Sequence, residues 1–444
     1  MRSELAAIVG ADHVLDPSAA YVQDASVASG VRGRADAVVR PGSAEEAAAV
    51  VAWCYDNDVA IVPRGGGTGF AGGAVPIGGG VVVSLERLRR ARSFDPLLWR
   101  MEVEAGLPTG EVHRLARENG LVFPPDPGAS ESSQIGGNVA TNAGGPHTFK
   151  YGVTGAWVTG IEAVVAPGEL VRLGGPVRKD VAGYDLRSLL VGSEGTLGLI
   201  TAVWLRLMPA PEAAVPVVAT YPDAASGAEA MQAVLASGVV PAAIEYLDGA
   251  TLRAAASGFP GDATAGFALI VEVDGTAAEV EAALPEVREA LGGDVVVPDD
   301  MRAFWAWRGG VSHAVTAQRG GKLSEDVAVP LDRLAEAVEE TLAIGARHGL
   351  EACSWGHAGD GNLHSTFLLT PGDEDEAARA ARAAEDLFAM AIRLGGTISG
   401  EHGLGILKNG QLARQWSPAA VELHRSVKRA LDPKNLFNPG KKLA

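Results

Sequence analysis

Short β-branched runs and one helical stretch alternate in the first part of the chain. Residues 36–63 follow a β-α-β pattern, because apolar runs at Ala37 to Val39 and Val59 to Val62 flank apolar residues at helical spacing. Ser43, with Glu46 three positions later, is typical of a capping box at the start of that helix. The apolar face of the helix consists of Ala47, Val50, Val51 and Cys54. Further elements are expected as strands near 81–85, 101–105, 163–165, 170–173 and 202–207, and as a helix near 108–119 whose first turn suits Pro108.

The order of predicted strands and helices changes after Pro209-Ala210-Pro211, which is a predicted domain boundary. A β-α-β-β-α-β order follows, which is typical of ferredoxin-like domains, and a similar order then repeats. We therefore expect an antiparallel sheet built from two related halves. The expected strands are 215–220, 242–247, 267–273, 294–297, 327–329, 351–357 and 363–369, and the expected helices are 224–237, 277–291, 331–348 and 374–394.

The last part of the chain predicts one more helix. Ser417 is a suitable N-cap, and Pro418 suits the first helical position. Leu431-Asp432-Pro433 ends the helix, since proline cannot continue it. We expect this segment to pack back on the first domain. The predicted organisation is therefore 1–210 (core 34–210), a second domain at 211–412, and a C-terminal segment at 413–444.

Composition narrows the class of protein. The chain has 444 residues, of which 47% are hydrophobic and 20% charged, as expected for a globular protein with more than one domain. Its net charge of −17 argues against nucleic acid as a partner. The start shows no signal-peptide pattern, and Cys54 and Cys353 follow no metal or redox spacing, so a cytoplasmic location is expected. Peripheral association with a membrane through an electron-acceptor partner is also open.

The segment 61–73 is the first candidate for ligand binding. Its glycines leave the backbone free to approach a ligand, and successive N–H groups can converge on an anion. Gly67, Gly69 and Gly72 match the dinucleotide-binding string Gly-x-Gly-x-x-Gly. That motif must open a helix, whereas here a strand follows, so we reject the Rossmann interpretation. A glycine-rich hairpin without a ligand is the alternative.

Two more segments share this character. Residues 124–152 contain Pro124-Pro125-Asp126-Pro127-Gly128 and then a run rich in Gly, Ser, Asn and Thr, so a long loop is expected. Residues 191–200 form a third glycine-rich turn that leads into a strand. Residues 124–152 could wrap a large polar cofactor with backbone amides and small polar side chains. A structural loop is the alternative for this stretch.

The stretch from Trp355 to His364 is the sharpest local signal. Asp360-Gly361 is a favoured central pair for a two-residue hairpin turn, which would pair His357 directly with His364. Opposed Cβ atoms in an antiparallel pair lie about 4.5–5.5 Å apart, so both imidazoles could bind one divalent ion. Hydrogen-bonded sheet histidines without a metal are the alternative.

Glu401 and His402 lie in a glycine-flanked segment. Glu401 could complete a site of two histidines and one carboxylate that suits Zn²⁺, Mn²⁺ or Fe²⁺. His402 would then be available as a general base. A helix-to-strand turn with solvated side chains is the alternative. Arg308 follows Phe304-Trp305-Ala306-Trp307, and Lys322 lies fourteen positions further on. Cations beside aromatic residues can hold a substrate carboxylate, although stacking of Arg308 on tryptophan at a surface is also open.

Taken together, these motifs resemble a known family. Pro63 to Gly69, the 135–145 segment and Gly192 to Gly198 are similar to the FAD-binding domain of the vanillyl-alcohol oxidase/p-cresol methylhydroxylase family. Pro241 to Glu245, the histidine hairpin, Glu401-His402-Gly403 and Leu431 to Lys441 resemble its D-2-hydroxyacid dehydrogenase branch, which includes D-lactate dehydrogenases, D-2-hydroxyglutarate dehydrogenases and the glycolate oxidase catalytic subunit.

The resemblance implies an α+β fold: a two-part FAD-binding domain of p-cresol methylhydroxylase type and a cap domain with a ferredoxin-like antiparallel sheet. It implies non-covalent FAD, because the first glycine loop lacks the histidine that bonds the flavin in some relatives. The diphosphate is expected on residues 64–69 and the flavin ring facing the second domain. The residues that it assigns to FAD are Pro63, Arg64, Gly65, Gly66, Gly67, Thr68, Gly69, Gly72, Pro127, Gly128, Ser133, Gly136, Gly137, Asn138, Ala140, Thr141, Asn142, Gly144, Gly145, Gly152, Glu194, Gly195, Gly198, Ile200 and Asn438.

The resemblance also assigns the chemistry of the second domain. It implies a divalent metal, Zn or Mn, at His357, His364 and Glu401, and a catalytic base at His402. Arg308 and Lys322 match carboxylate-binding positions. Thr366 stands where the D-2-hydroxyglutarate enzymes have asparagine, which argues against a long dicarboxylate substrate.

The resulting hypothesis is FAD-dependent oxidation of a D-2-hydroxy acid, D-lactate-like or glycolate-like, to the 2-oxo acid, with hydride transfer to flavin N5. Its electrons would pass to a quinone, a cytochrome, an electron-transfer flavoprotein or a separate iron–sulfur subunit, since the chain has no Cys cluster. A second hypothesis is the flavin-binding subunit of a glycolate oxidase-type complex that is inactive alone. A third is a metal-dependent hydrolase without flavin. The oligomeric state is open, a homodimer included.

Overall fold

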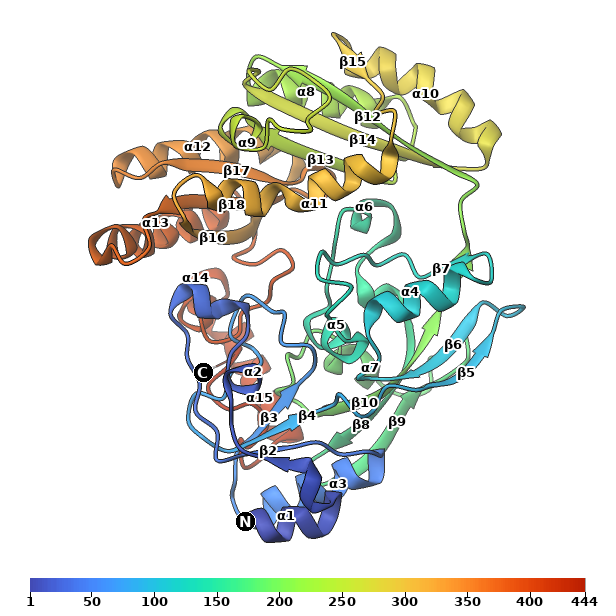
Figure 1. Cartoon of the computed structure of the whole chain (residues 1–444), viewed down its shortest axis with the longest axis vertical. Helices are drawn as coiled ribbons and strands as arrows, with labels where there is room; N and C mark the ends of the chain where they lie inside the picture. The colour runs from blue at the N-terminus through green and yellow to red at the C-terminus, as the bar shows by residue number, and fades with distance from the viewer. Residues whose placement is uncertain (444) are drawn as a thin grey trace. The chain divides into compact units, whose positions relative to one another are not determined.

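The computed structural model describes residues 1–443 and separates into two units (Figure 1). Unit 1 comprises Met1–Gly144, Gly152–Ala210 and Glu401–Ala444. Unit 2 comprises Gly145–Tyr151 and Pro211–Gly400. The division differs from the expected boundaries at two points, because residues 401–412 belong to unit 1 and residues 145–151 belong to unit 2.

A small mixed sheet holds the first glycine loop of unit 1. Its strand order is β1-β2-β4-β3, with β2 and β3 both parallel to β4 and β1 antiparallel to β2. The glycine loop therefore joins two parallel neighbours, so the hairpin alternative is wrong. The elements of this region are α1 (Arg2–Val9), β1 (Val14–Leu15), α2 (Ala19–Val22), β2 (Ala37–Val39), α3 (Ala44–Asp56), β3 (Ile61–Arg64) and β4 (Val81–Ser84).

Helix α3 begins at the predicted cap, and its predicted apolar face is buried. The Ser43 hydroxyl accepts a hydrogen bond from the Glu46 N–H at 3.1 Å. The reciprocal half of the capping box is absent among residues 1–443, because the Glu46 carboxylate accepts from the Gly42 N–H at 2.7 Å instead of from Ser43.

An antiparallel sheet of order β5-β6-β10-β8-β9 forms the second part of unit 1. The segment 124–152, expected to be a loop, contains two short helices. Gly136 lies in the first of them, where an added Cβ would stand 2.5 Å from the Ala105 Cβ, so this helix needs glycine to pack closely. The elements are β5 (Ala91–Asp95), β6 (Arg100–Glu104), α4 (Thr109–Arg117), β7 (Leu121–Val122), α5 (Ile135–Thr141), α6 (Thr148–Tyr151, in unit 2), β8 (Val158–Val165), β9 (Glu169–Gly174), α7 (Leu186–Leu190), β10 (Leu199–Arg206) and β11 (Met208–Pro209).

The C-terminal segment is part of unit 1 and contains α14 (Leu412–Gln415) and α15 (Pro418–Leu431). Ser417 caps α15 as predicted by accepting from the Ala420 N–H. After the helix, Phe437 lies beside Ile61 in a parallel bridge, so the tail contacts strand β3 next to the first glycine loop.

Unit 2 is built on one antiparallel sheet of order β15-β12-β14-β13-β17-β18-β16. The first four strands come from the first predicted half and the last three from the second. An isolated bridge between Ala328 and Thr397 lies where the second half would have its fourth strand. The two halves meet along β13 and β17. The strands are β12 (Ala213–Tyr221), β13 (Ala243–Asp248), β14 (Phe267–Gly275), β15 (Val295–Val296), β16 (Gly321–Ala328), β17 (Ala352–His357) and β18 (Asn362–Leu369).

Helices cover both faces of this sheet. Helices α8 (Ala224–Ala236), α10 (Ala277–Leu291), α12 (Leu334–Arg347) and α13 (Glu374–Arg393) form one layer. Helices α9 (Gly249–Ala254) and α11 (Met301–Ala317) pack together over the other face, where Phe304 and Val311 join a core with Leu247, Ile270 and Trp355. None of the helices in residues 1–443 has both the length and the apolar character of a bilayer-spanning segment.

Candidate functional site

The two histidines of the β17–β18 hairpin lie on one face of the unit 2 sheet. The turn is longer than predicted: Ala358–Asp360 form a 3₁₀ turn and Gly361 adopts φ 65°. His357 therefore pairs with Asn362, and His364 pairs with Trp355, so the predicted direct pair is wrong. A register shift of two residues keeps side chains on the same face. The imidazole rings still meet, with centroids 5.3 Å apart at 86°.

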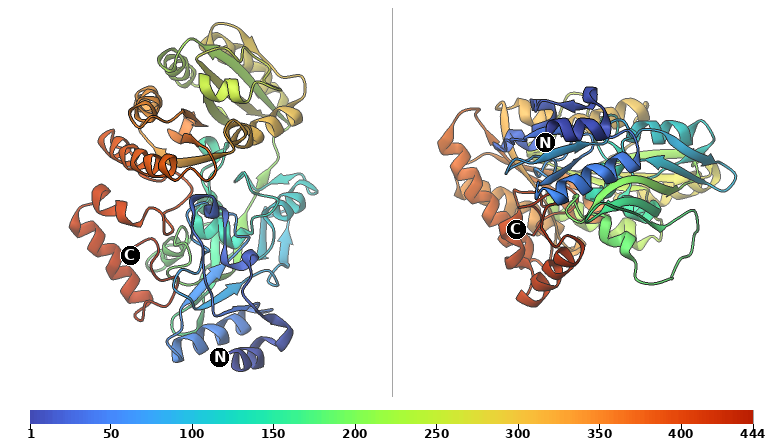
Figure 2. Two further views of the ribbon diagram at one scale, coloured as in Figure 1. Left: turned by 60° about the vertical axis from the view of Figure 1, so that its left-hand side comes forward. Right: turned by 90° about the horizontal axis from the view of Figure 1, so that it is seen from below.

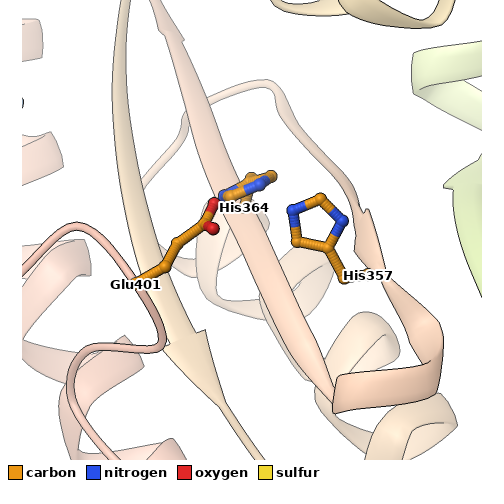
Figure 3. A group of neighbouring side chains, drawn as sticks. All are labelled: His357, His364 and Glu401. Carbon is orange, nitrogen blue, oxygen red and sulfur yellow. The ribbon is translucent and has the colours of Figure 1, made fainter. Parts of the chain in front are cut away.

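Glu401 supplies a carboxylate to the same place. His357, His364 and Glu401 each offer one ligand atom, and these atoms lie within 4.8 Å of one another (Figure 3). The chain that leads to Glu401 is attached to β16, because Thr397 bridges Ala328 and the Ser399 hydroxyl donates to the Asp326 carboxylate at 3.2 Å. Two imidazoles and one carboxylate suit a divalent metal and leave coordination positions open.

A buried carboxylate behind His357 fixes the orientation of its ring. Glu245 on β13 is fully buried, and its Oε1 lies 2.5 Å from His357 Nδ1. Its Oε2 accepts a hydrogen bond from the guanidinium of Arg308 on α11. Burial acts to raise the pKa of Glu245, but the neighbouring His357 and Arg308 outweigh it and hold that pKa below its ordinary value. Because Nδ1 of His357 is engaged, Nε2 is the nitrogen left for a metal.

The residues predicted to hold a substrate carboxylate lie around this hairpin in unit 2. Arg308 is 8% exposed, and its Nε is buried with no hydrogen-bond partner among residues 1–443. Lys322 Nζ donates to the Ser312 carbonyl at 3.1 Å and stands 4.9 Å from the Trp355 ring. Burial lowers the pKa of Lys322 to about 8. Thr366 is buried, and its hydroxyl lies 2.8 Å from the Ser324 hydroxyl.

The segment that carries His402 is fixed within unit 1. The Glu194 carboxylate accepts hydrogen bonds from the N–H groups of Leu404 at 3.0 Å and Gly405 at 2.7 Å. The Ala71 carbonyl, in the first glycine loop, accepts from the Ile406 N–H at 2.9 Å. The His402 ring lies 4.8 Å from the Phe70 ring. Glu194, predicted to bind FAD, therefore has a second role in positioning the His402 segment.

The three glycine-rich segments of unit 1 pack against each other through backbone contacts. An added Cβ on Gly66 would stand 2.4 Å from the Ser132 carbonyl oxygen, and one on Gly195 would stand 2.9 Å from Pro63. By contrast, apart from adjoining residues and the backbone of its own helix, no heavy atom of residues 1–443 lies within 4 Å of a Cβ built on Gly69, Gly128 or Gly137. These glycines thus leave space at which a ligand can approach the backbone.

Two buried polar atoms in the same segments support a cofactor site. Gln134 Oε1 and Ser193 Oγ have no hydrogen-bond partner among residues 1–443. Buried polar atoms are normally satisfied, so such atoms point to a missing ligand or water. The Arg64 guanidinium lies against the same loop, because a Cβ added to Gly67 would stand 2.1 Å from its Nη2, which also donates to the Ala20 carbonyl at 2.6 Å.

Sequence reasoning assigned no role to several of these residues. Glu245 appeared only within a motif, although a glutamate in the apolar run of β13 was itself a signal, since a buried charge needs a partner. Gln134 was not assigned. Asn362 is 4% exposed, its Oδ1 has no hydrogen-bond partner among residues 1–443, and it pairs with His357. That Asn362 lies opposite His357 follows only from the observed strand register, which the sequence did not predict.

Comparison with known proteins places the chain in a family. The model for "FAD linked oxidases, C-terminal domain" matches residues 210–442, and that for "FAD binding domain" matches residues 35–174. The chain is 36% identical to the glycolate oxidase subunit GlcD of Bacillus subtilis, over 92% of this chain and 89% of the relative. It is 34% identical to a D-lactate dehydrogenase of Anaerostipes hadrus, over 92% of this chain and 90% of the relative.

A third relative is the D-2-hydroxyglutarate dehydrogenase of Xanthomonas citri pv. viticola, which is 36% identical over 91% of this chain and 88% of the relative. Among solved structures, p-cresol methylhydroxylase with substrate bound matches with a TM-score of 0.81 and 19% identity, over all of this chain and 96% of the other. That likeness confirms the predicted fold class. The chain belongs to the FAD-linked oxidases, with an FAD-binding domain of p-cresol methylhydroxylase type, and is an oxidoreductase.

Proposed function

We propose that this protein oxidises a small D-2-hydroxy acid, such as D-lactate or glycolate, to the corresponding 2-oxo acid with non-covalently bound FAD and a divalent metal, Zn or Mn. The observation that carries the proposal is the group His357, His364 and Glu401, whose ligand atoms lie within 4.8 Å of one another. His402 follows Glu401 directly in the chain. The names of the relatives support this substrate class, since they are proteins of glycolate, D-lactate and D-2-hydroxyglutarate oxidation.

Each proposed residue has a defined task. His357, His364 and Glu401 would hold the metal, which when bound lowers the pKa of a coordinated hydroxyl. His402 would accept the proton of the substrate hydroxyl through an imidazole nitrogen. Arg308 would donate to the substrate carboxylate through its unpartnered Nε while Nη2 keeps its bond to Glu245. Lys322 would add positive charge. FAD, when bound, supplies the redox chemistry as the electron acceptor.

The backbone of the glycine-rich segments would hold FAD. Open space at Gly69, Gly128 and Gly137, together with the unsatisfied Gln134 and Ser193, supports this placement. The side chain at Thr366 is smaller than asparagine and is already bonded to Ser324. We therefore propose that short monocarboxylates are better substrates than long dicarboxylates.

The test is a panel of D- and L-2-hydroxy acids scored by anaerobic bleaching of flavin absorbance, with and without chelator. The expected result is bleaching by D-lactate or glycolate that a chelator abolishes and added Zn²⁺ or Mn²⁺ restores. Bleaching that is equally fast without metal would contradict the role of the metal. Absence of bleaching by every acid would contradict the substrate class.

A second candidate role is that of one subunit in a multi-chain complex. It is favoured by the name of the Bacillus subtilis relative, a glycolate oxidase subunit. Purified protein that bleaches with substrate and reduces an artificial dye at a comparable rate would exclude a chain that is inactive alone. The hydrolase hypothesis is wrong, since the chain belongs to the FAD-linked oxidases.

A further inference from the structure

A turn joins β5 and β6 in unit 1 (Figure 1). It exposes three large apolar side chains in succession. Leu97, Leu98 and Trp99 have exposed fractions of 89%, 52% and 39%. Scattered single apolar residues are normal on protein surfaces, but a contiguous group often marks an interaction site. We call Leu97, Leu98 and Trp99 the apolar tip.

The backbone of the apolar tip is held in a strained conformation. Trp99 has φ 54°, a left-handed conformation that glycine or asparagine adopts readily and a bulky side chain rarely does. The conformation is fixed, because the Asp95 carboxylate accepts from the Leu98 N–H at 3.2 Å and the Trp99 carbonyl accepts from the Leu207 N–H at 2.7 Å. A strained conformation at an exposed aromatic residue indicates a role outside folding.

A second exposed segment lies against the apolar tip. Residues 175–185 form an extended green loop in Figure 2, and Val181 and Tyr184 in it are 97% and 94% exposed. The Arg178 guanidinium stands 5.6 Å from the Trp99 ring, and Arg100 donates to the Pro176 carbonyl at 3.1 Å. The tip and the loop therefore form one continuous surface patch.

The charge of this patch differs from that of the whole chain. Its four cations are Arg100, Arg178, Lys179 and Arg206, and its three carboxylates are Asp95, Asp180 and Asp185. The patch is thus net positive on a protein whose net charge is −17. Because charges in solution are screened beyond a Debye length of about 8 Å at physiological salt, the local sign governs what can bind here. The complementary surface is anionic.

We propose that this patch docks the protein on an anionic lipid bilayer. Leu97 and Leu98 would enter the boundary between headgroups and acyl chains, with Trp99 at headgroup level, as is typical of tryptophan at membrane interfaces. Arg178 and Lys179 would contact lipid phosphates. A bilayer fits better than a protein partner because the apolar residues lie at protruding turns, which deformable lipid accepts without a matching concave surface. This inference goes beyond the proposed oxidation and does not depend on it.

The test is co-sedimentation of the purified full-length flavoprotein with lipid vesicles. Binding is expected to equimolar phosphatidylcholine and phosphatidylglycerol, but not to phosphatidylcholine alone, and should weaken at high salt. Leu97→Ser with Leu98→Ser should weaken binding about tenfold or more. Arg178→Ser with Lys179→Ser should weaken it about tenfold. The matched control is Leu423→Ser, a residue on α15 that is 69% exposed and lies outside the patch; it should bind like the wild type.

A third variant, Trp99→Asn, separates loss of vesicle binding from loss of folding. Asparagine tolerates positive φ, so this variant should keep its flavin and its thermal midpoint while binding anionic vesicles less tightly. Absence of binding by the wild-type protein, or binding that both double variants retain, would overturn the proposal. It would also be overturned if an acidic electron-carrier protein, rather than vesicles, bound the wild type and was lost in the same variants.

Discussion

The two halves of the unit 2 sheet share an arrangement of strands but differ in chemistry. In the first half, β13 and β14 are joined by a long connection that contains α9, whereas β17 and β18 in the second half are joined by residues 358–361. Counted from the pair Tyr246 and Gly356, where β13 meets β17, the places held by His357 and His364 in the second half are held by Leu247 and Ile270 in the first.

The difference shows how one frame serves two purposes. Leu247 and Ile270 belong to the apolar core beneath α11. The equivalent histidines sit beside a tight turn, where their rings meet and where Glu401 reaches them. Glu245 joins the two halves, because it belongs to the first half and orients His357 of the second. In the proposed metal site, the first half thus supplies support through Glu245, and the second half supplies the two histidine ligands.

The greatest loss of activity is expected when a proposed metal ligand, rather than a core residue in the other half of the sheet, is truncated to alanine. His364→Ala should lose the bound metal and slow substrate oxidation at least about a thousandfold, while the free energy of unfolding changes little, since a metal Lewis acid contributes several kcal/mol to the transition state. Leu247→Ala should lower the free energy of unfolding by about 2–5 kcal/mol but retain the metal. Metal analysis and denaturant unfolding measure the two effects. The same loss of metal in both variants would contradict the comparison.

The next effect separates proton transfer from metal binding. His402→Ala should lower kcat about 10²–10⁴-fold, as expected for loss of a general base, with metal and FAD content unchanged. Steady-state kinetics and metal analysis on one preparation provide the measurement. Full turnover of every D-2-hydroxy acid by this variant would remove His402 from the proposed mechanism.

A smaller effect, on metal affinity, tests whether Glu245 in the first half orients His357 in the second. Glu245→Gln keeps the shape of the side chain but weakens the bond that orients His357, so metal affinity should fall about 10–100-fold. Metal titration against a competing chelator measures it. The matched control is Glu272→Gln on β14, a residue bonded to His147 and Trp305 instead, which should keep wild-type affinity. Equal losses in both variants would indicate a general disturbance of the sheet.

The smallest effect concerns pH. Because burial lowers the pKa of Lys322 to about 8, the residue carries its charge below that pH and loses it above. The KM for an anionic substrate should therefore rise as the pH increases through about 8, and Lys322→Met should have a raised KM with this pH dependence removed. A variant that keeps the wild-type pH profile of KM would show that another group is responsible.

The sequence was most informative where residues close together in the chain decide the structure. The apolar face of α3, the cap at Ser417 and the repeated strand order of unit 2 could all be predicted, because helical spacing, capping chemistry and strand patterns are local. The face shared by His357 and His364 was also predictable, although the register was not. A two-residue turn at Asp360-Gly361 and the observed longer turn both fit the local sequence, and the structure has the longer one.

Long-range partners could not be read from the chain. Nothing near Arg64 in the sequence shows that its guanidinium turns to Ala20, or that Glu194 accepts from Leu404 and Gly405, more than two hundred residues away. Helix α5 was missed because glycine lowers helix propensity, and Gly136 is required there for close packing against Ala105. In these cases tertiary contacts override local preference.

The most direct test of the proposed metal site is the metal content of the purified protein after dialysis against Zn²⁺ or Mn²⁺ and removal of excess ion. One bound ion per wild-type chain is expected, with the same amount in Ile270→Val and none in His364→Ala or Glu401→Ala. Retention of the ion in both ligand variants, or its absence from the wild-type protein, would contradict the claim that the second half of the sheet is built around a metal.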